Sequence, residues 1–380
     1  MYIVPYFSHF KLLPPPSTHT YTMEQNTISH HLEAHPKPKA IALISGGLDS
    51  LLAARVILDE GCHVEGINFY TGFCVEGHTH AIRQRKAKKP KRNDALWVAA
   101  RLGIELHIMD VSEEYKDILI NPRHGYGAHM NPCLDCKCFM VRKAHEWMLA
   151  HDFDFIITGE VVGQRPKSQR RDTMPVVARE SGAGNRLLRP LCAGNLPPTL
   201  PEERGWVRRE HLYDFNGRSR KPQMALAARF GFSDYAQPAG GCCFLTDAQY
   251  SAKLADLWAS RGERTYELDD IMLLKVGRHL RPRPHFKLII AREEGENRFL
   301  EGYRRRFTHL DTVSHPGPVT LVDGTPDQQD LHLAARLTAR FGKGRDTDNV
   351  TVRITYRDGA AQSLTVKPMP PEEIPRAWYL

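Results

Sequence analysis

The stretch SGGLDS at residues 45–50 follows an apolar run and precedes a helical pattern. The first N–H groups of a helix lack backbone partners and the helix dipole is positive there, so a glycine-rich turn at this place can bind an anion. The glycines let the backbone approach a phosphate, the serines add hydroxyl donors, and the aspartate can hold Mg²⁺ or orient a loop amide. A plain helix cap is the alternative. The candidate residues are Ser45, Gly46, Gly47, Asp49 and Ser50.

Cysteines form the second candidate site. Cys133 and Cys136 are separated by two residues in MNPCLDCKCFM. They lie at a predicted loop–helix junction, which favours thiolate over thiol. Cys242 could complete a set of three thiolates, one fewer than closed iron–sulfur clusters and structural zinc sites usually take. A cluster held by three thiolates would keep one iron open. Structural zinc and a cluster-free persulfide pair are the alternatives, and Cys243 is a further candidate as fourth ligand or persulfide carrier.

The other cysteines are expected to have no chemical role. Cys62, Cys74 and Cys192 are predicted to be small buried apolar side chains. Cys138 lies two residues beyond Cys136 on the expected helix, so its side chain should point elsewhere.

Strand and helix patterns alternate through the region that carries these residues. Strands are predicted at 40–44, 63–70, 104–111 and 153–160, and helices at 50–61, 94–103 and 134–152. This alternation indicates βαβ units and a parallel sheet covered on both faces. We therefore predict a doubly wound α/β domain over residues 39–250.

The two ends of the chain have a different character. Residues 1–38 combine prolines with polar residues and show no period, which predicts a disordered tail. Strand and helix patterns after residue 250 predict a smaller α+β domain over residues 260–380.

Composition limits the class of protein. The chain has 380 residues, 41% of them hydrophobic and 25% charged, with no apolar run long enough to span a bilayer. We expect a cytoplasmic protein with reduced thiols and no membrane partner. The net charge of +8, with seven Lys or Arg among residues 83–92, favours a polyanionic partner, although the basic run could equally be a solvated loop.

Three stretches resemble known families. SGGLDS resembles the pyrophosphate loop (PP-loop) of the N-type ATP pyrophosphatases, which have an adenine nucleotide alpha hydrolase-like fold. TGEVVGQRPKSQ, residues 158–169, resembles a segment of the tRNA 4-thiouridine synthetases, and LLRPL at 187–191 continues that likeness. PAGGCCFLTD at 238–247 resembles a Gly-Gly-Cys segment of related tRNA thiolation enzymes.

The resemblance implies an ATP-dependent tRNA sulfurtransferase that adenylates a uridine carbonyl oxygen and then replaces it with sulfur. ATP and Mg²⁺ would bind at the PP-loop, with adenine near Asn68 and Phe69. The cations Lys167 and Arg165 would act at the α-phosphate. The resemblance also places Gly159 and Gln164 near the nucleotide. It implies that the ligands of an iron–sulfur cluster are Cys133, Cys136 and Cys242. Sulfide or a persulfide carrier would donate the sulfur, and a homodimer is compatible with the sequence.

The C-terminal region also resembles a known domain. LKVGRHLRP, residues 274–282, resembles the small RNA-binding domain of ribosome quality-control factors. The resemblance implies tRNA binding by a basic edge that contains Lys275, Arg278, His279 and Arg281. Two other functions stay open: a PP-loop ligase acting on a small molecule, and a nucleotide-regulated RNA-binding protein without catalysis.

Overall fold

The computed structural model describes residues 37–75, 92–236 and 243–380. All but two residues of the predicted tail, all but Arg92 of the basic run, and Cys242 therefore lie outside the described residues.

Five parallel strands form the first sheet, in the order β3-β2-β1-β4-β5. They are β1 Lys39–Leu43, β2 His63–Tyr70, β3 Leu106–Asp110, β4 Phe155–Ile157 and β5 Leu187–Leu188. The strand order reverses between β1 and β4. Open α/β sheets bind ligands beyond the carboxyl ends of their strands at such a point. TGE directly follows β4, and SGGLDS follows β1 after Ile44.

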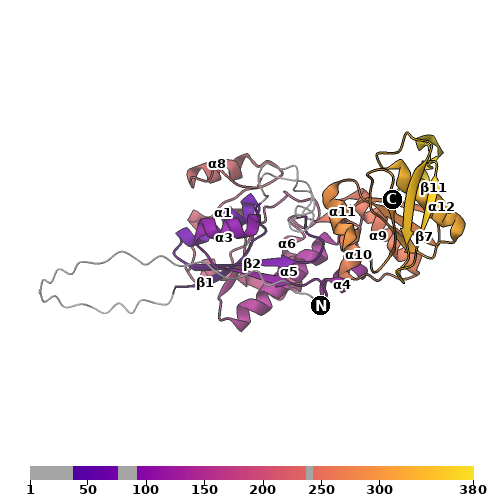
Figure 1. Cartoon of the computed structure of the whole chain (residues 1–380). Coiled ribbons are helices and arrows are strands. Elements are labelled where there is room, and N and C mark those ends of the chain that lie inside the picture. The colour runs from indigo at the N-terminus through magenta and orange to yellow at the C-terminus, as the bar shows by residue number, and fades with distance from the viewer. Residues whose placement is uncertain (1–36, 76–91, 237–242) are drawn as a thin grey trace, which may run out of the picture. The chain divides into compact units, whose positions relative to one another are not determined.

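Helices cover both faces of this sheet. They are α1 Leu48–Asp59, α3 Asp94–Leu102, α4 Tyr115–Ile120, α5 Cys133–Ala150, α6 Met174–Glu180, α7 Leu200–Glu203 and α8 Lys221–Arg229. Ala40 and Ala42 of β1 pack with α1 and α3, whereas Ile41 between them packs with α5. Figure 1 shows these helices around the sheet. Because alternate residues of a strand point to opposite faces, this packing confirms the doubly wound α/β prediction.

One predicted strand is much shorter than expected. The sequence predicts a strand over 153–160, but β4 ends at Ile157. The next residues leave the sheet because Gly159 packs directly against the first turn of α1, where a Cβ atom would lie 2.4 Å from the carbonyl carbon of Asp49.

Two helices near residue 260 pack into the first domain. Tyr250 and Leu257 of α9 Ala248–Arg261, and Ile271 of α10 Leu268–Leu273, belong to the same apolar cluster as Phe139 of α5. The predicted boundary near residue 260 falls inside α9. We therefore propose that the smaller domain begins after α10.

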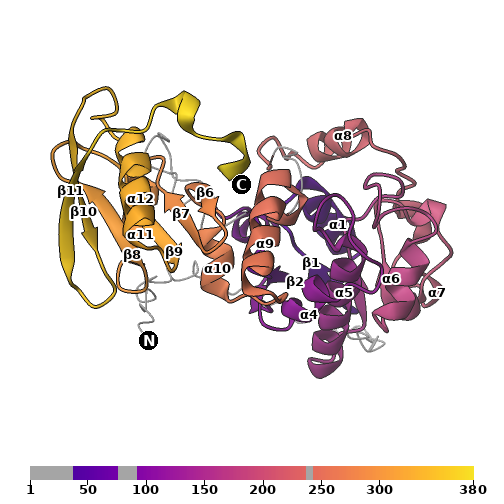
Figure 2. The same ribbon diagram turned by 90° about the vertical axis from the view of Figure 1, so that its right-hand side faces the viewer.

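Six antiparallel strands form the second sheet, in the order β11-β10-β8-β9-β7-β6 (Figure 2). They are β6 Arg278–Arg283, β7 Phe286–Ile290, β8 Thr308–Thr312, β9 Thr320–Gly324, β10 Val350–Thr355 and β11 Ala361–Val366. Helix α12 Gln328–Arg340 packs with Leu288 of β7, whereas α11 Glu294–Glu301 packs with the neighbouring Ile289. The two helices thus cover opposite faces, and the α+β prediction is confirmed.

No helix among the described residues combines the length and the apolar character needed to cross a bilayer.

Candidate active site at the carboxyl ends of β1 and β4

The PP-loop is a tight turn from β1 into α1. Gly46 has φ of +80°, a conformation that favours glycine. A Cβ atom there would lie 2.8 Å from Asp94 and Ala95, so the loop packs closely on the N-terminus of α3. The Ser50 hydroxyl donates to the carbonyl of Gly47 at 2.8 Å. The loop therefore has a fixed shape at the start of α1, where unpaired N–H groups can meet a phosphate.

Asp49 is the most connected side chain of this loop. Its Oδ2 accepts a hydrogen bond from Gln164 Nε2 at 2.8 Å, and its Oδ1 lies 3.2 Å from Arg220 Nη2 in an ion pair that does not have hydrogen-bond geometry. Gln223 Nε2 in turn donates to Gln164 Oε1 at 3.1 Å. Burial raises the pKa of Asp49 above its usual value, although Arg220, Gln164 and Arg165 all favour the ionised form.

Two of these partners were not found in the sequence. Arg220 and Gln223 lie at the start of α8, more than a hundred and sixty residues after the loop that they contact. The polar stretch NGRSRKPQ contains them but has no motif that marks a nucleotide site. Only the fold brings them to Asp49.

Asn68 and Phe69, the two residues predicted to contact adenine, point to opposite faces of the sheet. Asn68 Nδ2 donates to the carbonyl oxygen of Ile44, next to the PP-loop, at 2.6 Å. Phe69 is 7% exposed and packs in the core on the opposite face of the sheet. Their contact with adenine stays a prediction.

A buried carboxylate follows β4. Glu160 accepts hydrogen bonds from Arg189 Nε at 3.1 Å and from Thr158 Oγ1 at 3.0 Å, and Lys137 Nζ lies 3.9 Å from its other oxygen. Burial alone would raise the pKa of Glu160, but Lys137 and Arg189 outweigh it and hold the pKa below its usual value. This ion pair joins the TGE turn to α5, the helix that begins with the cysteine pair.

The cysteine pair occupies the first turn of α5. Pro132 precedes the helix, and Cys133 is its first residue, in agreement with the predicted loop–helix junction. The Cys133 thiol donates to the Ser168 hydroxyl at 3.2 Å. Cys136 is half-buried, one turn along the helix.

Segment 158–169 therefore connects the two candidate sites. Gln164 contacts Asp49 of the PP-loop, and Ser168 contacts Cys133 of the CxxC pair. Gly159 at the start of the same segment packs against α1. The predicted nucleotide and cysteine residues are thus neighbours through one segment of the chain.

Lys167 has a specific set of partners in this segment. Its Nζ donates to the carbonyl oxygens of His124, Gly125 and Tyr126 at 3.4, 3.2 and 2.7 Å. These contacts fix the loop that leads to Cys133. The role of Lys167 as a cation at the α-phosphate stays a prediction.

A third ligand for the pair does not come from the described residues. No group of three His, Cys, Asp or Glu donors within 37–75, 92–236 and 243–380 includes both Cys133 and Cys136. Cys242, the predicted third ligand, lies outside this part of the chain. Its neighbour Cys243 donates weakly to Asn131 Oδ1 at 3.8 Å, two residues before Cys133.

Three of the four remaining cysteines are buried. This agrees with the prediction for Cys62 and Cys192; for Cys138 the sequence predicts only that its side chain points away from the pair. Cys62, Cys138 and Cys192 are 5%, 8% and 0% exposed. Burial raises the pKa of each of these thiols to about 11, so they stay protonated at neutral pH. The prediction that Cys74 is also a buried apolar side chain is wrong, because Cys74 is half-buried and pairs across an isolated antiparallel bridge with Cys243.

The prediction of a basic edge on the smaller domain is wrong. Lys275 is buried, and its ammonium donates to the carbonyl of Gly72. His279 is 1% exposed, and Arg281 is paired with Asp256 of α9. These side chains hold neighbouring elements together instead of facing solvent.

The fourth residue of that edge is also engaged within the protein. Arg278 lies over the ring of Phe341, 4.8 Å from its centroid. Basic side chains that are exposed in this domain include Arg305, Arg353 and Arg357.

Two family models match the chain. Residues 36–195 match "Thiamine biosynthesis protein (ThiI)", and residues 277–379 match "NFACT protein RNA binding domain". The chain thus has one region similar to the ThiI family and a second region similar to the NFACT RNA-binding domain.

Curated relatives match part of the chain. The "tRNA-specific 2-thiouridylase MnmA" of Tropheryma whipplei (strain Twist) is 31% identical over 129 residues, which are 32% of this chain and 33% of that protein. MnmA of Marinomonas sp. (strain MWYL1) is 31% identical over 147 residues, 37% of this chain and 36% of that protein. The chain therefore spans about a third of the length of these curated relatives.

Two solved structures each resemble a part of the chain. A complex of 4-thiouridine synthetase with RNA and bound ATP has a TM-score of 0.31 and 22% identity, covering 40% of this chain and 36% of that one. The C-terminal part of the fibronectin/fibrinogen-binding protein from Streptococcus suis has a TM-score of 0.25 and 14% identity, covering 35% of this chain and 67% of that one.

Proposed function

We propose that the chain is an ATP-dependent tRNA sulfurtransferase, which adenylates a uridine carbonyl oxygen and replaces it with sulfur. One observation carries the proposal: segment 158–169 contacts the PP-loop through Gln164 and the CxxC pair through Ser168. An enzyme that activates a base with ATP and then delivers sulfur to it needs both chemistries within reach of one base. The partial likeness to tRNA thiouridylases supports this assignment.

The PP-loop suits the phosphates of ATP. Backbone amides at the start of α1 and the Ser45 hydroxyl would receive the departing pyrophosphate. Ser50 would join them once its hydroxyl turns from the Gly47 carbonyl, to which it donates in this structure. Asp49 Oδ1 is buried and accepts no hydrogen bond among the described residues, so it has a free lone pair for Mg²⁺. Arg220 beside it adds positive charge where negative charge leaves.

The reaction would then proceed in two displacements. The uridine carbonyl oxygen attacks the α-phosphorus of ATP, and pyrophosphate leaves toward the PP-loop. A sulfur nucleophile attacks the activated ring carbon, and AMP leaves with the former carbonyl oxygen. Ser168 would hold the Cys133 sulfur at this place, and Lys167 would fix the loop in front of it.

The donor set of the sulfur site fits more than one group. Cys133, Cys136 and Cys242 would hold an iron–sulfur cluster, which would present sulfide at an open iron. Zinc, or no metal with a persulfide on one cysteine, uses the same thiols. The iron and acid-labile sulfide content of protein purified without oxygen, compared with that of Cys133→Ser, separates these cases.

The RNA-binding domain would hold the tRNA. Arg305, Arg353 and Arg357 of this domain are exposed and can contact phosphates. Arg281, by contrast, is already paired with Asp256. The proposed place of action is the cytoplasm.

Release of pyrophosphate with and without added tRNA tests this function. We expect release that depends on tRNA and falls at least about 100-fold in Asp49→Asn, because a preorganised charge site is lost. The control is Asp59→Asn, an exposed carboxylate at the far end of α1. Release without tRNA but with a small acid would instead indicate a small-molecule ligase, and tRNA binding without any release would indicate an RNA-binding protein.

A further inference from the structure

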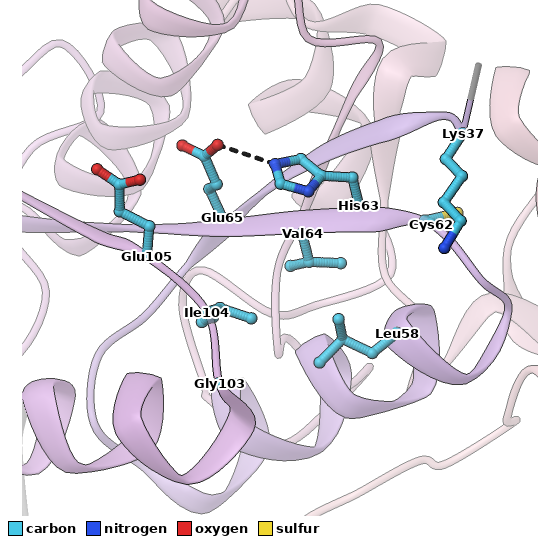
Figure 3. Close-up of a pocket in the computed structure, with 9 residues that line it drawn as sticks. All are labelled: Lys37, Leu58, Cys62, His63, Val64, Glu65, Gly103, Ile104 and Glu105. Atoms are coloured by element: carbon cyan, nitrogen blue, oxygen red, sulfur yellow. Dashed lines mark hydrogen bonds and ion pairs between the residues drawn. The ribbon is translucent and has the colours of Figure 1, made fainter. Parts of the chain in front are cut away.

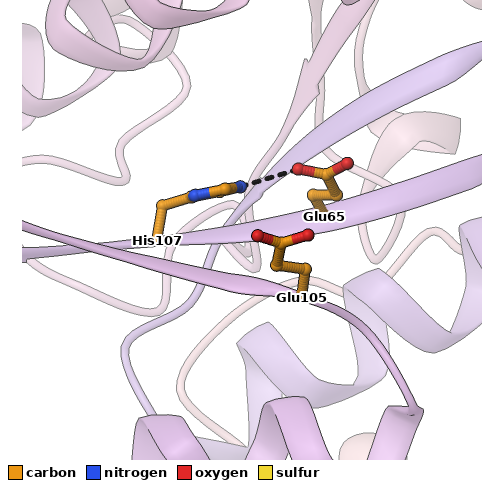
Figure 4. A group of neighbouring side chains, drawn as sticks. All are labelled: Glu65, Glu105 and His107. Atoms are coloured by element: carbon orange, nitrogen blue, oxygen red, sulfur yellow. Dashed lines mark hydrogen bonds and ion pairs between the residues drawn. The ribbon is translucent and has the colours of Figure 1, made fainter.

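A second group of chemically active side chains lies at the amino ends of the first sheet's strands, whereas the PP-loop follows the carboxyl end of β1. Glu65 is near the start of β2, His107 is in β3, and Glu105 directly precedes β3. One donor atom from each lies within 4.8 Å of the other two. Figure 4 shows the three side chains converging.

The backbone register determines this convergence. Gly66 pairs with Leu106 and Ile67 with His107 in the parallel ladder, and Gly66 N donates to the carbonyl of Glu105 at 2.7 Å. Neighbouring residues in register point to the same face, so Glu65, Glu105 and His107 share one face. The backbone register alone therefore places all three side chains on this face.

Two imidazoles hold Glu65 in place. His107 Nε2 lies 2.6 Å from one carboxylate oxygen, and His63 Nε2 lies 2.9 Å from the other. Burial would raise the pKa of Glu65, but these hydrogen bonds outweigh it and hold the pKa below its usual value. Trp147 of α5 packs on the His107 ring with centroids 4.7 Å apart, which restricts its orientation.

Glu105 has no such support. Its carboxylate has no hydrogen-bond or ion-pair partner among the described residues, although it faces Glu65. Two carboxylates at this separation repel each other, and a divalent cation between them would remove the repulsion. Figure 3 shows both side chains projecting to the same side of their strands, at a surface pocket of about 230 Å³ that they help to line.

The geometry points to a site for one Zn²⁺ ion, bound by His107 Nε2 and by one oxygen each of Glu65 and Glu105, with water in the fourth position. An imidazole with carboxylates is a donor set that zinc accepts, and its ligand atoms lie roughly 3.3 Å apart in a tetrahedron with bonds of about 2.0–2.2 Å. Rotation of the exposed Glu105 side chain can close the remaining gap. The ion would replace the proton shared by His107 Nε2 and Glu65, which leaves to solvent, and their 2.6 Å contact would open to the ligand spacing. His63 would orient Glu65 from the other side.

Such an ion would connect the edge strand β3 to β2. It would lie apart from the PP-loop and the cysteine pair, so its role would be to stabilise the sheet and not to take part in sulfur transfer. The inference therefore stands independently of the proposed function.

Titration calorimetry with Zn²⁺ alone tests the site. The full chain carries Cys133→Ser, Cys136→Ser, Cys242→Ser and Cys243→Ser, so that thiolates do not compete for the metal. We expect one Zn²⁺ per chain, at least about tenfold weaker binding in Glu105→Gln, and a Zn²⁺-dependent rise in Tm that this variant lacks. The matched control in the same background replaces an exposed histidine and glutamate of the smaller domain, His332→Gln with Glu372→Gln, and should bind like the parent.

The outcomes are decisive because Glu105 is exposed and its replacement should not disturb folding. An unchanged metal-free Tm in Glu105→Gln, together with weaker Zn²⁺ binding, supports the site. Equal Zn²⁺ affinity in parent and Glu105→Gln, or no Zn²⁺ binding by the parent, overturns it. With native cysteines, Glu105→Gln should retain tRNA-dependent pyrophosphate release, and this measurement separates a failure of the metal site from a failure of the proposed function.

Discussion

Single residues of the candidate site have roles that their types alone do not reveal. Asp49 is ionisable, but burial disfavours its charge, and Arg220 and Gln164 compensate only in part. A buried carboxylate whose charge is only partly compensated is stabilised by a further cation, and under the proposed function that cation would be the Mg²⁺ bound with ATP. Lys167, by contrast, is a cation whose hydrogen bonds go to backbone carbonyls.

Gly159 is predicted to be essential because of its lack of a side chain. In Gly159→Ala the new Cβ would lie 2.4 Å from the Asp49 carbonyl carbon, so the first turn of α1 has to move. We expect a loss of about 1–3 kcal/mol in the free energy of unfolding. We also expect weaker ATP binding, with a fractional loss of affinity larger than the fractional loss of unfolding free energy. Denaturant unfolding and ATP titration measure the two effects.

The control for this prediction is Gly302→Ala at the end of α11, where the nearest contact of a new Cβ atom would be 3.3 Å and φ is negative. Wild-type ATP affinity in Gly159→Ala would show that the turn after β4 does not position the PP-loop.

Lys275 predicts a pH dependence of stability. Burial lowers its pKa from the usual 10.5 to about 8, so between these pH values the unfolded chain binds more protons than the folded chain. Stability therefore rises with pH across this window and is lost as the pH falls through 8. Relative to Lys275→Met, the wild type should gain about 2 kcal/mol between pH 7 and 9.5.

Urea unfolding of both proteins at the two pH values provides the measurement. Exposed Lys367→Met is the control, for which the difference from wild type should not change with pH. A constant difference between wild type and Lys275→Met would contradict the buried, partly neutral state of Lys275.

At the scale of elements, the architecture was predicted from the sequence more accurately than the side-chain contacts were. Strand and helix periods were sufficient for the parallel sheet and for α5 beginning at the cysteine pair. The ends of β4 were missed because Thr158 and Glu160 look like strand residues, whereas packing of Gly159 against α1 ends the strand. The charges around β6 were interpreted as a surface, but tertiary packing buries or pairs them.

The pairing of distant loops could not be predicted. Arg220 and Gln223 reach Asp49, and Cys74 meets Cys243, through long-range topology that leaves no local pattern. The Glu65, Glu105 and His107 group likewise depends on the register of β2 and β3.

The bridge between Cys74 and Cys243 predicts a disulfide on oxidation. Phe244 N donates to the carbonyl of Phe73 at 2.9 Å, which makes the two cysteines a non-hydrogen-bonded antiparallel pair with Cα atoms about 4.5 Å apart. Disulfides span about 4.4–6.8 Å between Cα atoms. Mild oxidation by diamide should therefore cross-link them.

Peptide mass spectrometry after digestion without reduction detects this link. Cys192, which is fully buried, is the internal control and should stay reduced. Oxidation that links other cysteines but leaves Cys74 and Cys243 unlinked would contradict the bridge.

At the scale of the whole molecule, the proposed function divides between the two domains. The α/β domain would hold the ATP and sulfur chemistry, and the C-terminal domain, which is similar to the NFACT RNA-binding domain, would supply RNA affinity. Deletion of residues 277–380 should weaken tRNA binding and reduce the slope of affinity against salt concentration, because phosphate contacts are lost. ATP affinity should remain, since the PP-loop contacts described here lie before residue 277.

Filter binding at several salt concentrations measures this effect, and circular dichroism confirms that the shortened chain is folded. An unchanged salt slope in a folded truncation would assign tRNA binding to the α/β domain.

The most direct test of the central claim is nucleoside mass spectrometry of tRNA after incubation with the protein, ATP, Mg²⁺ and sulfide under anaerobic conditions. We predict a uridine in which one oxygen is replaced by sulfur, formed by wild type and by Asp59→Asn but not by Asp49→Asn or Cys133→Ser. Cys133→Ser should still release pyrophosphate, because adenylation precedes sulfur delivery. Wild-type protein that releases tRNA-dependent pyrophosphate but leaves every uridine unthiolated, or Cys133→Ser protein that thiolates normally, would contradict the account.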